Sequence, residues 1–219
     1  MKNIIPEDSR YVPMTQQKSC CVPTSISIVM YKLGTPLVSQ ELLGYHLGLI
    51  VDEKNKDFFW NPRTGERPLA GYGTQIGLEE YNPDIAFEKL NIPLRMVVHS
   101  VDEFELREED SLNKKEVGRM DSRLRGNDNR KDFVTFVSDC INEDRDILAC
   151  FNHGTLKGDG SSNGHTCVVD RIYPEKNIIR LIDPSPNQPK WRELAIDKFK
   201  KAMENHPINK GGFWEIIRK

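Results

Sequence analysis

The sequence predicts an α+β fold, with an N-terminal helical lobe and a C-terminal lobe built on an antiparallel β-sheet. The segment "PTSISIVMYKLG" (23–34) has a proline near its start and a glycine at its end, which are signals that begin and end a helix. Later, the β-rich runs "HTCVVDRIY" (165–173) and "NIIRLIDP" (177–184) flank a proline-containing turn, as in a β-hairpin. At 219 residues the chain is long enough for one sizeable core, so we expect a single domain over 1–219.

The other elements of the first half follow from local signals. "SQELLGYHLGLI" (39–50) predicts a second helix with Ser39 as its N-cap, and "NPDIAFEKLNI" (82–92) predicts a third. "PLRMVVHS" (93–100) predicts a strand. Residues 52–74 are rich in glycine, proline and charge, which indicates a long loop.

The character of the chain changes over 105–131, where charged residues are dense and apolar residues are few. This composition predicts a flexible, solvated insertion rather than a nucleic-acid-binding arm. Part of it, "DSRLRGNDNR" (121–130), resembles the translated product of a palindromic repeat element scattered through bacterial genomes. A segment of that origin would have entered a tolerant loop and would carry no chemistry.

The second half contains further helix and strand signals. "DFVTFVSDCINED" predicts an amphipathic helix with Cys140 on its apolar face. "DILACFN" is a short apolar run typical of a buried strand, so we expect Cys150 to be a packing residue. "ELAIDKFKKAM" predicts a final helix anchored by Trp191, and "GGFWEIIRK" (211–219) predicts an edge strand.

The charge balance and the first residues limit the partners and the compartment. A net charge of −2 gives no reason to expect nucleic acid or an anionic membrane surface as a partner. "MKNIIPEDSRYVP" carries charge and proline where a signal peptide needs an apolar core, and no later run is apolar enough to span a bilayer. We therefore expect a cytoplasmic protein, or one exported by a route other than the general secretory pathway.

Five cysteines is an odd number for a chain in which no secretory leader is recognised, and it favours reduced thiols over a disulfide framework. A zinc site needs compact, repeated ligand spacings. Here Cys20 and Cys21 are adjacent, while Cys140, Cys150 and Cys167 stand alone. We therefore expect no metal and no other cofactor.

The predicted hairpin joins a histidine to an aspartate. Folding it about Pro174 brings His165 opposite Asp183 at the open end, within mutual reach. A carboxylate at that point orients an imidazole and fixes its tautomer. The simpler interpretation is that His165 caps a strand and Asp183 begins a turn, but the matched geometry favours a functional pair. The other histidines lack such a partner, although His153 borders a glycine-rich loop and could line the site.

The paired cysteines precede the first predicted helix. Cys21 stands just before the Pro23 helix start, where the positive helix end and an imidazolium would lower its pKa and favour the thiolate. Cys20 is one residue further out. An upstream glutamine, Gln16 or Gln17, could donate to an oxyanion together with the backbone N–H of the cysteine.

Two stretches resemble the papain-clan cysteine peptidases related to the bacteriocin-leader (double-glycine) peptidases. "CVPTSISIVMYKLG" is similar to their Cys-Gly-Pro-Ala/Thr-Ser helix start, and "GHTCVVDRIYPEKNIIRLIDP" to their His-strand-turn-strand-Asp-Pro segment. The resemblance implies a papain-like fold and a triad of Cys21, His165 and Asp183, with Gln16 or Gln17 as oxyanion donor. The separation of cysteine and histidine falls within the roughly 130–150 residues of papain-like enzymes. The implied activity is hydrolysis of a peptide, isopeptide or related amide bond in a peptide or protein substrate.

The sequence departs from that family in three places. Val22 replaces the usual glycine after the nucleophile, which crowds the oxyanion hole. Cys20 adds a second thiol, and both glutamines lie slightly closer to the cysteine than in the family. These departures leave open a catalytically degenerate papain-like module that binds a peptide.

The C-terminal part is also similar to the phytochelatin synthases, papain-like enzymes in which a tryptophan after the aspartate segment leads into a helix. Trp191 followed by "ELAIDKFKKAM" has that layout. The alternative implied here is a γ-glutamylcysteine transpeptidase or glutathione hydrolase. Specificity would come from residues 50–130, where no motif is recognised.

Overall fold

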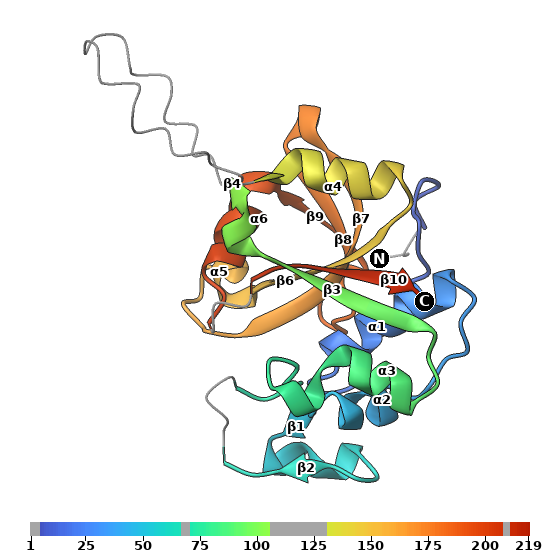
Figure 1. Cartoon of the computed structure of the whole chain (residues 1–219). Helices are drawn as coiled ribbons and strands as arrows, with labels where there is room; N and C mark the ends of the chain where they lie inside the picture. The colour runs from blue at the N-terminus through green and yellow to red at the C-terminus, as the bar shows by residue number, and fades with distance from the viewer. Residues whose placement is uncertain (1–4, 67–70, 106–130, 208–210) are drawn as a thin grey trace, which may run out of the picture.

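A six-stranded antiparallel β-sheet organises the chain (Figure 1). The computed structural model describes residues 5–66, 71–105, 131–207 and 211–219. In these residues the sheet has the order β3-β10-β6-β7-β8-β9. Its strands are β3 (Leu94–Ser100), β6 (Asp146–Asn152), β7 (Gly164–Tyr173), β8 (Ile178–Ile182), β9 (Trp191–Ala195) and β10 (Gly212–Arg218). The expected α+β class is therefore confirmed.

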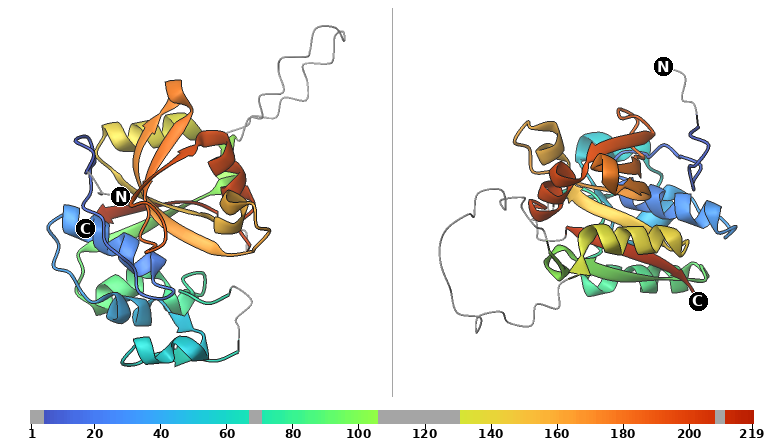
Figure 2. Two further views of the ribbon diagram at one scale, coloured as in Figure 1. Left: turned by 180° about the vertical axis from the view of Figure 1, so that it is seen from behind. Right: turned by 90° about the horizontal axis from the view of Figure 1, so that it is seen from above.

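Helices cover both faces of this sheet (Figures 1 and 2). α1 (Cys21–Lys32) and α3 (Pro83–Lys89) pack on one face, and α2 (Gln40–His46) packs against α1. α4 (Phe133–Asn142) and α6 (Ile196–Glu204) pack on the other face. The short α5, residues 153–157, contacts α6.

Alternating strand side chains supply a hydrophobic core on each face. In β6, Leu148 and Cys150 join the cluster that contains α1, whereas Ile147, Ala149 and Phe151 join the cluster that contains α4 and α6. Every residue of β6 is buried because helices lie on both sides of it. This confirms the buried strand predicted from the apolar run.

The helix starts follow the predicted capping signals, with one shift. The Ser39 side chain accepts from the backbone of α2, which confirms it as N-cap, and Asn82 caps α3 in the same way. α1 begins at Cys21, two residues before the predicted start, and Cys20 occupies the N-cap position without a side-chain hydrogen bond. The thiol of Cys21 therefore belongs to the first turn of α1.

The predicted loop over 52–74 contains only short elements among its described residues. They are a 3₁₀ helix, η1 (Glu53–Phe58), and strand β2 (Arg63–Thr64), which pairs in parallel with β1 (Ile50–Val51). Elsewhere in the described residues there are three more 3₁₀ turns, η2 (Glu79–Tyr81), η3 (Val101–Glu103) and η6 (Pro174–Lys176).

The insertion predicted at 105–131 falls almost wholly on 106–130, which lie outside the described residues. Its two ends are described. β4 (Phe104–Glu105) and β5 (Lys131–Asp132) pair side by side in parallel. The chain therefore leaves the described structure and re-enters it at the same place.

Two predictions near the C-terminus were wrong. β10 is not an edge strand, because it lies between β3 and β6. The residues that follow Trp191 form edge strand β9 rather than the start of a helix, and α6 begins only at Ile196. Trp191 Nε1 donates to Ser9 Oγ (2.8 Å), so this side chain anchors the N-terminal segment.

The turn and a bulge set the register of the β7–β8 hairpin. The turn comprises η6 and Asn177, whose φ of 53° is left-handed, so its centre lies after Pro174. The register also shifts between Val169 and Arg171, which leaves Asp170 as a bulge. The pairing therefore differs from the one predicted by folding about the proline.

This register changes which residues face one another at the open end of the hairpin. Val168 pairs with Ile182, and continuing that pairing places Cys167 opposite Asp183. His165 is then the diagonal neighbour of Asp183 on the same face, a position from which long side chains still meet.

No helix in the described ranges is long and apolar enough to cross a membrane.

Candidate active site

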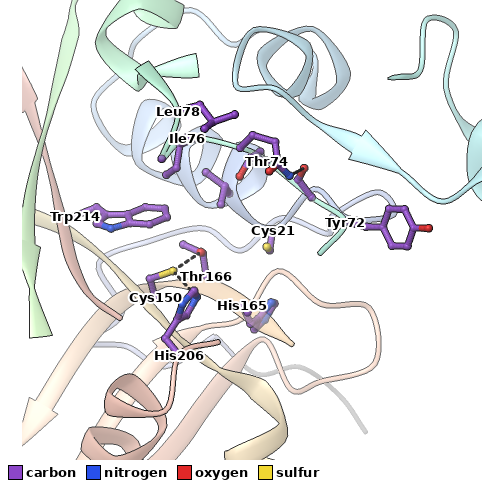
Figure 3. Close-up of a pocket in the computed structure, with 15 residues that line it drawn as sticks. Cys21, Tyr72, Thr74, Ile76, Leu78, Cys150, His165, Thr166, His206 and Trp214 are labelled. Carbon is purple, nitrogen blue, oxygen red and sulfur yellow. Dashed lines mark hydrogen bonds between the residues drawn. The ribbon is translucent and has the colours of Figure 1, made fainter. Parts of the chain in front are cut away.

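Three segments that are far apart in the sequence meet beside one cavity (Figure 3). Cys21 is the first residue of α1, His165 lies near the start of β7, and Asp183 directly follows β8. Cys21 and His165 both line the cavity, and Asp183 is hydrogen-bonded to His165. The structure thus brings together the three residues of the predicted triad.

The carboxylate of Asp183 is buried and fully hydrogen-bonded. His165 Nε2 lies 2.8 Å from Asp183 Oδ1, which also accepts from the backbone N–H of Ser185 (2.9 Å). Arg192 Nη1 donates to Asp183 Oδ2 (3.1 Å). Burial raises the pKa of Asp183, but these contacts, that of His165 first, lower it to about 2. Since the carboxylate is ionised, Nε2 of His165 carries the proton and donates.

The same imidazole lowers the pKa of the Cys21 thiol. Burial raises the pKa of Cys21, but the hydrogen bond with His165 and its positive charge outweigh burial, and the net pKa is lowered. The backbone of Thr166 and of Val22 adds to this effect. The N-terminal turn of α1 also favours a negative charge at this point.

The imidazole of His165 is shifted in the opposite direction. Burial lowers the pKa of His165, but contacts with Cys167, Asp183 and Cys21 raise it well above its ordinary value. A lowered thiol pKa together with a raised imidazole pKa favours a thiolate–imidazolium pair. Such a pair is the reactive form of a cysteine nucleophile.

The cavity beside Cys21 has a volume of about 150 Å³. The loop from Tyr72 to Leu78 forms one wall, and the start of β7 at Gly164–Thr166 forms the opposite wall (Figure 3). Trp214 of β10 closes one side, together with Cys150 and His206. The space is large enough for part of an extended chain to reach the sulfur.

The two candidate oxyanion donors differ in position. Gln16 is partly buried, its backbone N–H donates to Pro184 O (2.9 Å), and its Oε1 is buried without a hydrogen-bond partner among the described residues. Gln17 is exposed, and its backbone N–H donates to Gln40 Oε1 (2.8 Å). Neither glutamine lines the cavity, but Gln16 is tied to the segment that follows Asp183. Gln16 is therefore the better candidate.

A second thiol–imidazole contact in the cavity was not predicted. Cys150 Sγ lies 3.5 Å from His206 Nε2 and accepts from Thr166 Oγ1 (3.6 Å). Cys150 is buried in the cluster that contains α1, as expected for a packing residue, and it also contacts the ring of His206. Gly164 permits this approach, because a Cβ there would lie 2.9 Å from His206 Nε2. No local pattern links these positions, since they meet only after α6 packs against β6.

Two other histidines also differ from expectation. His153 does not line the cavity, but its ring packs edge-on against that of His165 with centroids 5.0 Å apart. Burial first, and then the charge of His165, lower the pKa of His153 to about 4. His99 has a carboxylate partner, since its Nε2 lies 3.2 Å from Glu215 Oε2, away from the cavity.

One group of described residues has the composition of a metal site. His165, Cys167 and Asp183 offer ligand atoms that lie within 4.8 Å of one another. Sequence spacing did not reveal this group because the hairpin register creates it. However, burial raises the pKa of Cys167 to about 12, and Asp183 is already bound to Arg192. A thiol of that pKa is a poor ligand at neutral pH.

The thiol adjacent to Cys21 is chemically different from it. Cys20 is fully buried beside Leu49, Val51 and Phe59. Burial raises its pKa to about 12, and the neighbouring Cys21 adds to the shift. Cys20 is therefore a packing residue with an unreactive thiol, and of the adjacent pair only Cys21 faces the cavity.

No protein-family model and no curated protein matches the chain. The chemistry of the site is therefore inferred from its own residues. They combine a thiol of lowered pKa, an imidazole of raised pKa and an ionised carboxylate at the wall of one cavity.

Proposed function

We propose that this protein is a papain-like cysteine hydrolase that cleaves a peptide, isopeptide or related amide bond. The observation that carries the proposal is the meeting of Cys21, at the start of α1, with His165, which is bound to Asp183 at 2.8 Å. The helix with the thiol packs on an antiparallel sheet whose hairpin supplies the imidazole and the carboxylate. This arrangement agrees with the papain-clan resemblance of the sequence.

In the proposed reaction the Cys21 thiolate attacks the substrate carbonyl carbon, and the C=O electron pair moves to oxygen. The backbone N–H of Cys21 and the side chain of Gln16 donate to the oxyanion, with Gln17 as the other candidate donor. As the C–N bond breaks, the His165 imidazolium gives its proton to the leaving amine. Neutral His165 then takes a proton from water, whose oxygen attacks the thioester. The acid product leaves, and the thiolate–imidazolium pair is restored.

One observation favours a second candidate, a degenerate papain-like module that binds a peptide without cleaving it. Val22 lines the cavity, and its side chain is packed at the position next to the sulfur. A branched side chain there narrows the space for an oxyanion. The lowered pKa of Cys21 favours the hydrolase, because a binding module has no use for a thiolate.

Alkylation by iodoacetamide, read out by mass spectrometry, tests the proposed nucleophile. At pH 6 an ordinary thiol is less than about 1% thiolate, so we expect Cys21 to label at least about tenfold faster than Cys140. Burial raises the pKa of Cys140 to about 11, which makes it a control in the same molecule. In His165→Gln the labelling of Cys21 should begin only at higher pH, because the group that lowers its pKa is gone. Equal rates for the two cysteines at pH 6 would contradict the proposal.

Turnover separates the candidate functions once Cys21 is shown to be reactive. The hydrolase predicts that a random peptide library is cut by the wild type and not by Cys21→Ala. A reactive Cys21 without any cleavage supports the binding module. A transpeptidase of the phytochelatin synthase type would instead join γ-glutamylcysteine units when given glutathione and a soft metal ion.

A further inference from the structure

A second cavity continues from the one that holds Cys21. It has a volume of about 220 Å³, and its apolar walls include Met96 and Val98 of β3. Both cavities are lined by Ile76, Gly77 and Trp214, so they form one groove. Figure 3 shows Trp214 and Ile76 together on one side of Cys21. We call this surface, from Cys21 past Ile76, Gly77 and Trp214 to Met96 and Val98, the Trp214 groove.

The far end of the Trp214 groove has an open backbone edge. β3 is an edge strand, and Met96 N–H donates to Asp84 Oδ1 (2.7 Å) while Ser100 N–H donates to Glu103 Oε1 (2.9 Å). Both backbone N–H groups thus point away from β10. Because the N–H groups of every second residue in a strand point to the same side, the N–H of Val98 also points away from β10. Among the described residues this amide makes no hydrogen bond, and Val98 is 59% exposed. In the described part of the chain, the backbone N–H of Val98 is therefore left without a hydrogen-bond partner at this edge of the sheet, beside an apolar cavity.

The order of the strands gives the length of the groove. His165 lies on β7 and Val98 on β3, which are three strand spacings apart. At about 4.8 Å per spacing this is about 14 Å across the sheet. Val98 is aligned through Trp214 and Leu148 with Val168, which lies three residues, or about 10 Å, along β7 from His165. The two components give a separation of about 17 Å, which an extended chain covers with about five residues at about 3.3 Å each.

We infer that the Trp214 groove binds the substrate as an extended peptide, with a large apolar side chain in the second cavity and one peptide C=O accepting from the backbone N–H of Val98. This inference rests on the proposed hydrolase function, and it places the apolar residue about five positions from the scissile bond. Because this path crosses the strands, the peptide makes a single backbone hydrogen bond at the edge, with the Val98 N–H, and the side-chain pocket supplies specificity. The exposed apolar side chain of Val98, together with Met96, supplies the surface that such a residue covers.

Digestion of a random dodecapeptide library by the full chain, with sequencing of the products, tests the inference. We expect Leu, Met or Phe to be enriched at one position, about five residues from the cut bond. Val98→Asp puts a charge in the second cavity, so the enrichment should disappear and kcat/KM for the best peptide should fall about tenfold. Leu37→Asp is the matched control, because Leu37 is 48% exposed and lies outside both cavities.

A second variant separates the backbone contact from the pocket. Val98→Pro removes the outward N–H, a change that edge strands tolerate. It should raise KM for the best peptide while the preferred residue stays at the same position. Unchanged kinetics for both Val98→Pro and Val98→Asp would overturn the inference.

Labelling of Cys21 distinguishes a failure of the groove from a failure of the function. If Cys21 labels fast and peptides are cut with no apolar preference at that distance, the groove inference is wrong and the hydrolase stands. If no peptide is cut, binding of the fluorescein-labelled library to Cys21→Ala is measured instead. Weaker binding in the added Val98→Asp background supports the groove, and equal binding overturns it.

Discussion

Three donors converge on Asp183, and together they decide what this side chain can do. Oδ1 accepts from His165 and from the Ser185 backbone, while Oδ2 accepts from Arg192. A carboxylate held in this way stays ionised and keeps one geometry, so it orients the imidazole and does not exchange protons with it. Arg192 is thus a positioning residue, acting on the thiol through two other side chains.

Arg192→Met tests this role through stability and reactivity. The folded-state pKa of Asp183, about 2, lies below its value in an unfolded chain, about 3.9. Its contribution to stability is therefore complete above about pH 4 and is lost as the pH falls toward 2. Removing the guanidinium raises this pKa, so the free energy of unfolding should fall by about 1–2 kcal/mol at pH 7 and by less at pH 3. Urea unfolding at both pH values measures the difference.

A purely structural arginine would not affect the thiol. We therefore expect Arg192→Met to slow iodoacetamide labelling of Cys21 at pH 6 by a few fold, because the imidazole is less well oriented. Arg171→Met is the control, since Arg171 bonds to the backbone of Asp8 away from the cavity. If the two variants label alike, Arg192 does not act on the site.

At the residue scale, local sequence signals identified Cys21, His165 and Asp183 as candidates but missed their neighbours. A cysteine before a helix and a histidine in a hairpin each have a short-range signature. Cys167 and Arg192 do not, because their contacts with the triad depend on strand register and on β9 lying beside β8. The sequence therefore pointed to the three side chains of the proposed triad without the residues that contact them.

Among the elements, the β7–β8 hairpin shows how a wrong register can still yield a correct contact. The turn extends to Asn177, and the Asp170 bulge shifts the register by one residue. The bulge has a tertiary cause, because the Asp170 carboxylate binds Arg180 Nε (2.7 Å) and the backbone N–H of Arg10 (2.8 Å). No inspection of the hairpin alone reveals the contact with Arg10, although Arg180 lies on β8 itself. His165 and Asp183 still meet because diagonal neighbours on one face are within reach.

The start of β10 depends on a glycine. Gly212 has a φ of 141°, and a Cβ there would lie 2.1 Å from the carbonyl oxygen of His99 on β3. We expect Gly212→Ala to lower the free energy of unfolding by at least about 3 kcal/mol, because both backbones are fixed in the sheet. Urea unfolding measures this loss. Gly34→Ala is the control, since Gly34 has a φ of 64° with open space around it and should cost only about 1 kcal/mol. Equal losses would show that the close approach to β3 is unimportant.

For the whole molecule, composition and local patterns were enough for the fold class but not for the order of the strands. The helices over 40–46, 83–89 and 133–142 were predicted from caps and periodicity. The insertion of β10 between β3 and β6 was not predicted, because those strand pairings join residues more than 60 positions apart in the sequence. This central position of β10 places Trp214 in the walls of both cavities, and hence determines the shape of the groove.

The two ends that flank residues 106–130 lie side by side, and this arrangement suggests a deletion experiment. Phe104 and Lys131 are paired neighbours, and Phe104 is anchored in the core at 2% exposed. Because the ends already lie side by side, replacing 106–130 by about a dozen Gly/Ser residues should preserve the fold. Halving a loop changes its closure entropy by only about 0.6 kcal/mol, so the free energy of unfolding should stay within about 1 kcal/mol of the wild type. Labelling of Cys21 at pH 6 should also be unchanged.

Phe104→Ala is the control at the same place, with an expected loss of about 3–5 kcal/mol in the free energy of unfolding from the core. A shortened chain that loses as much stability as Phe104→Ala, or loses Cys21 labelling, would show that the segment contributes to the fold or to the site.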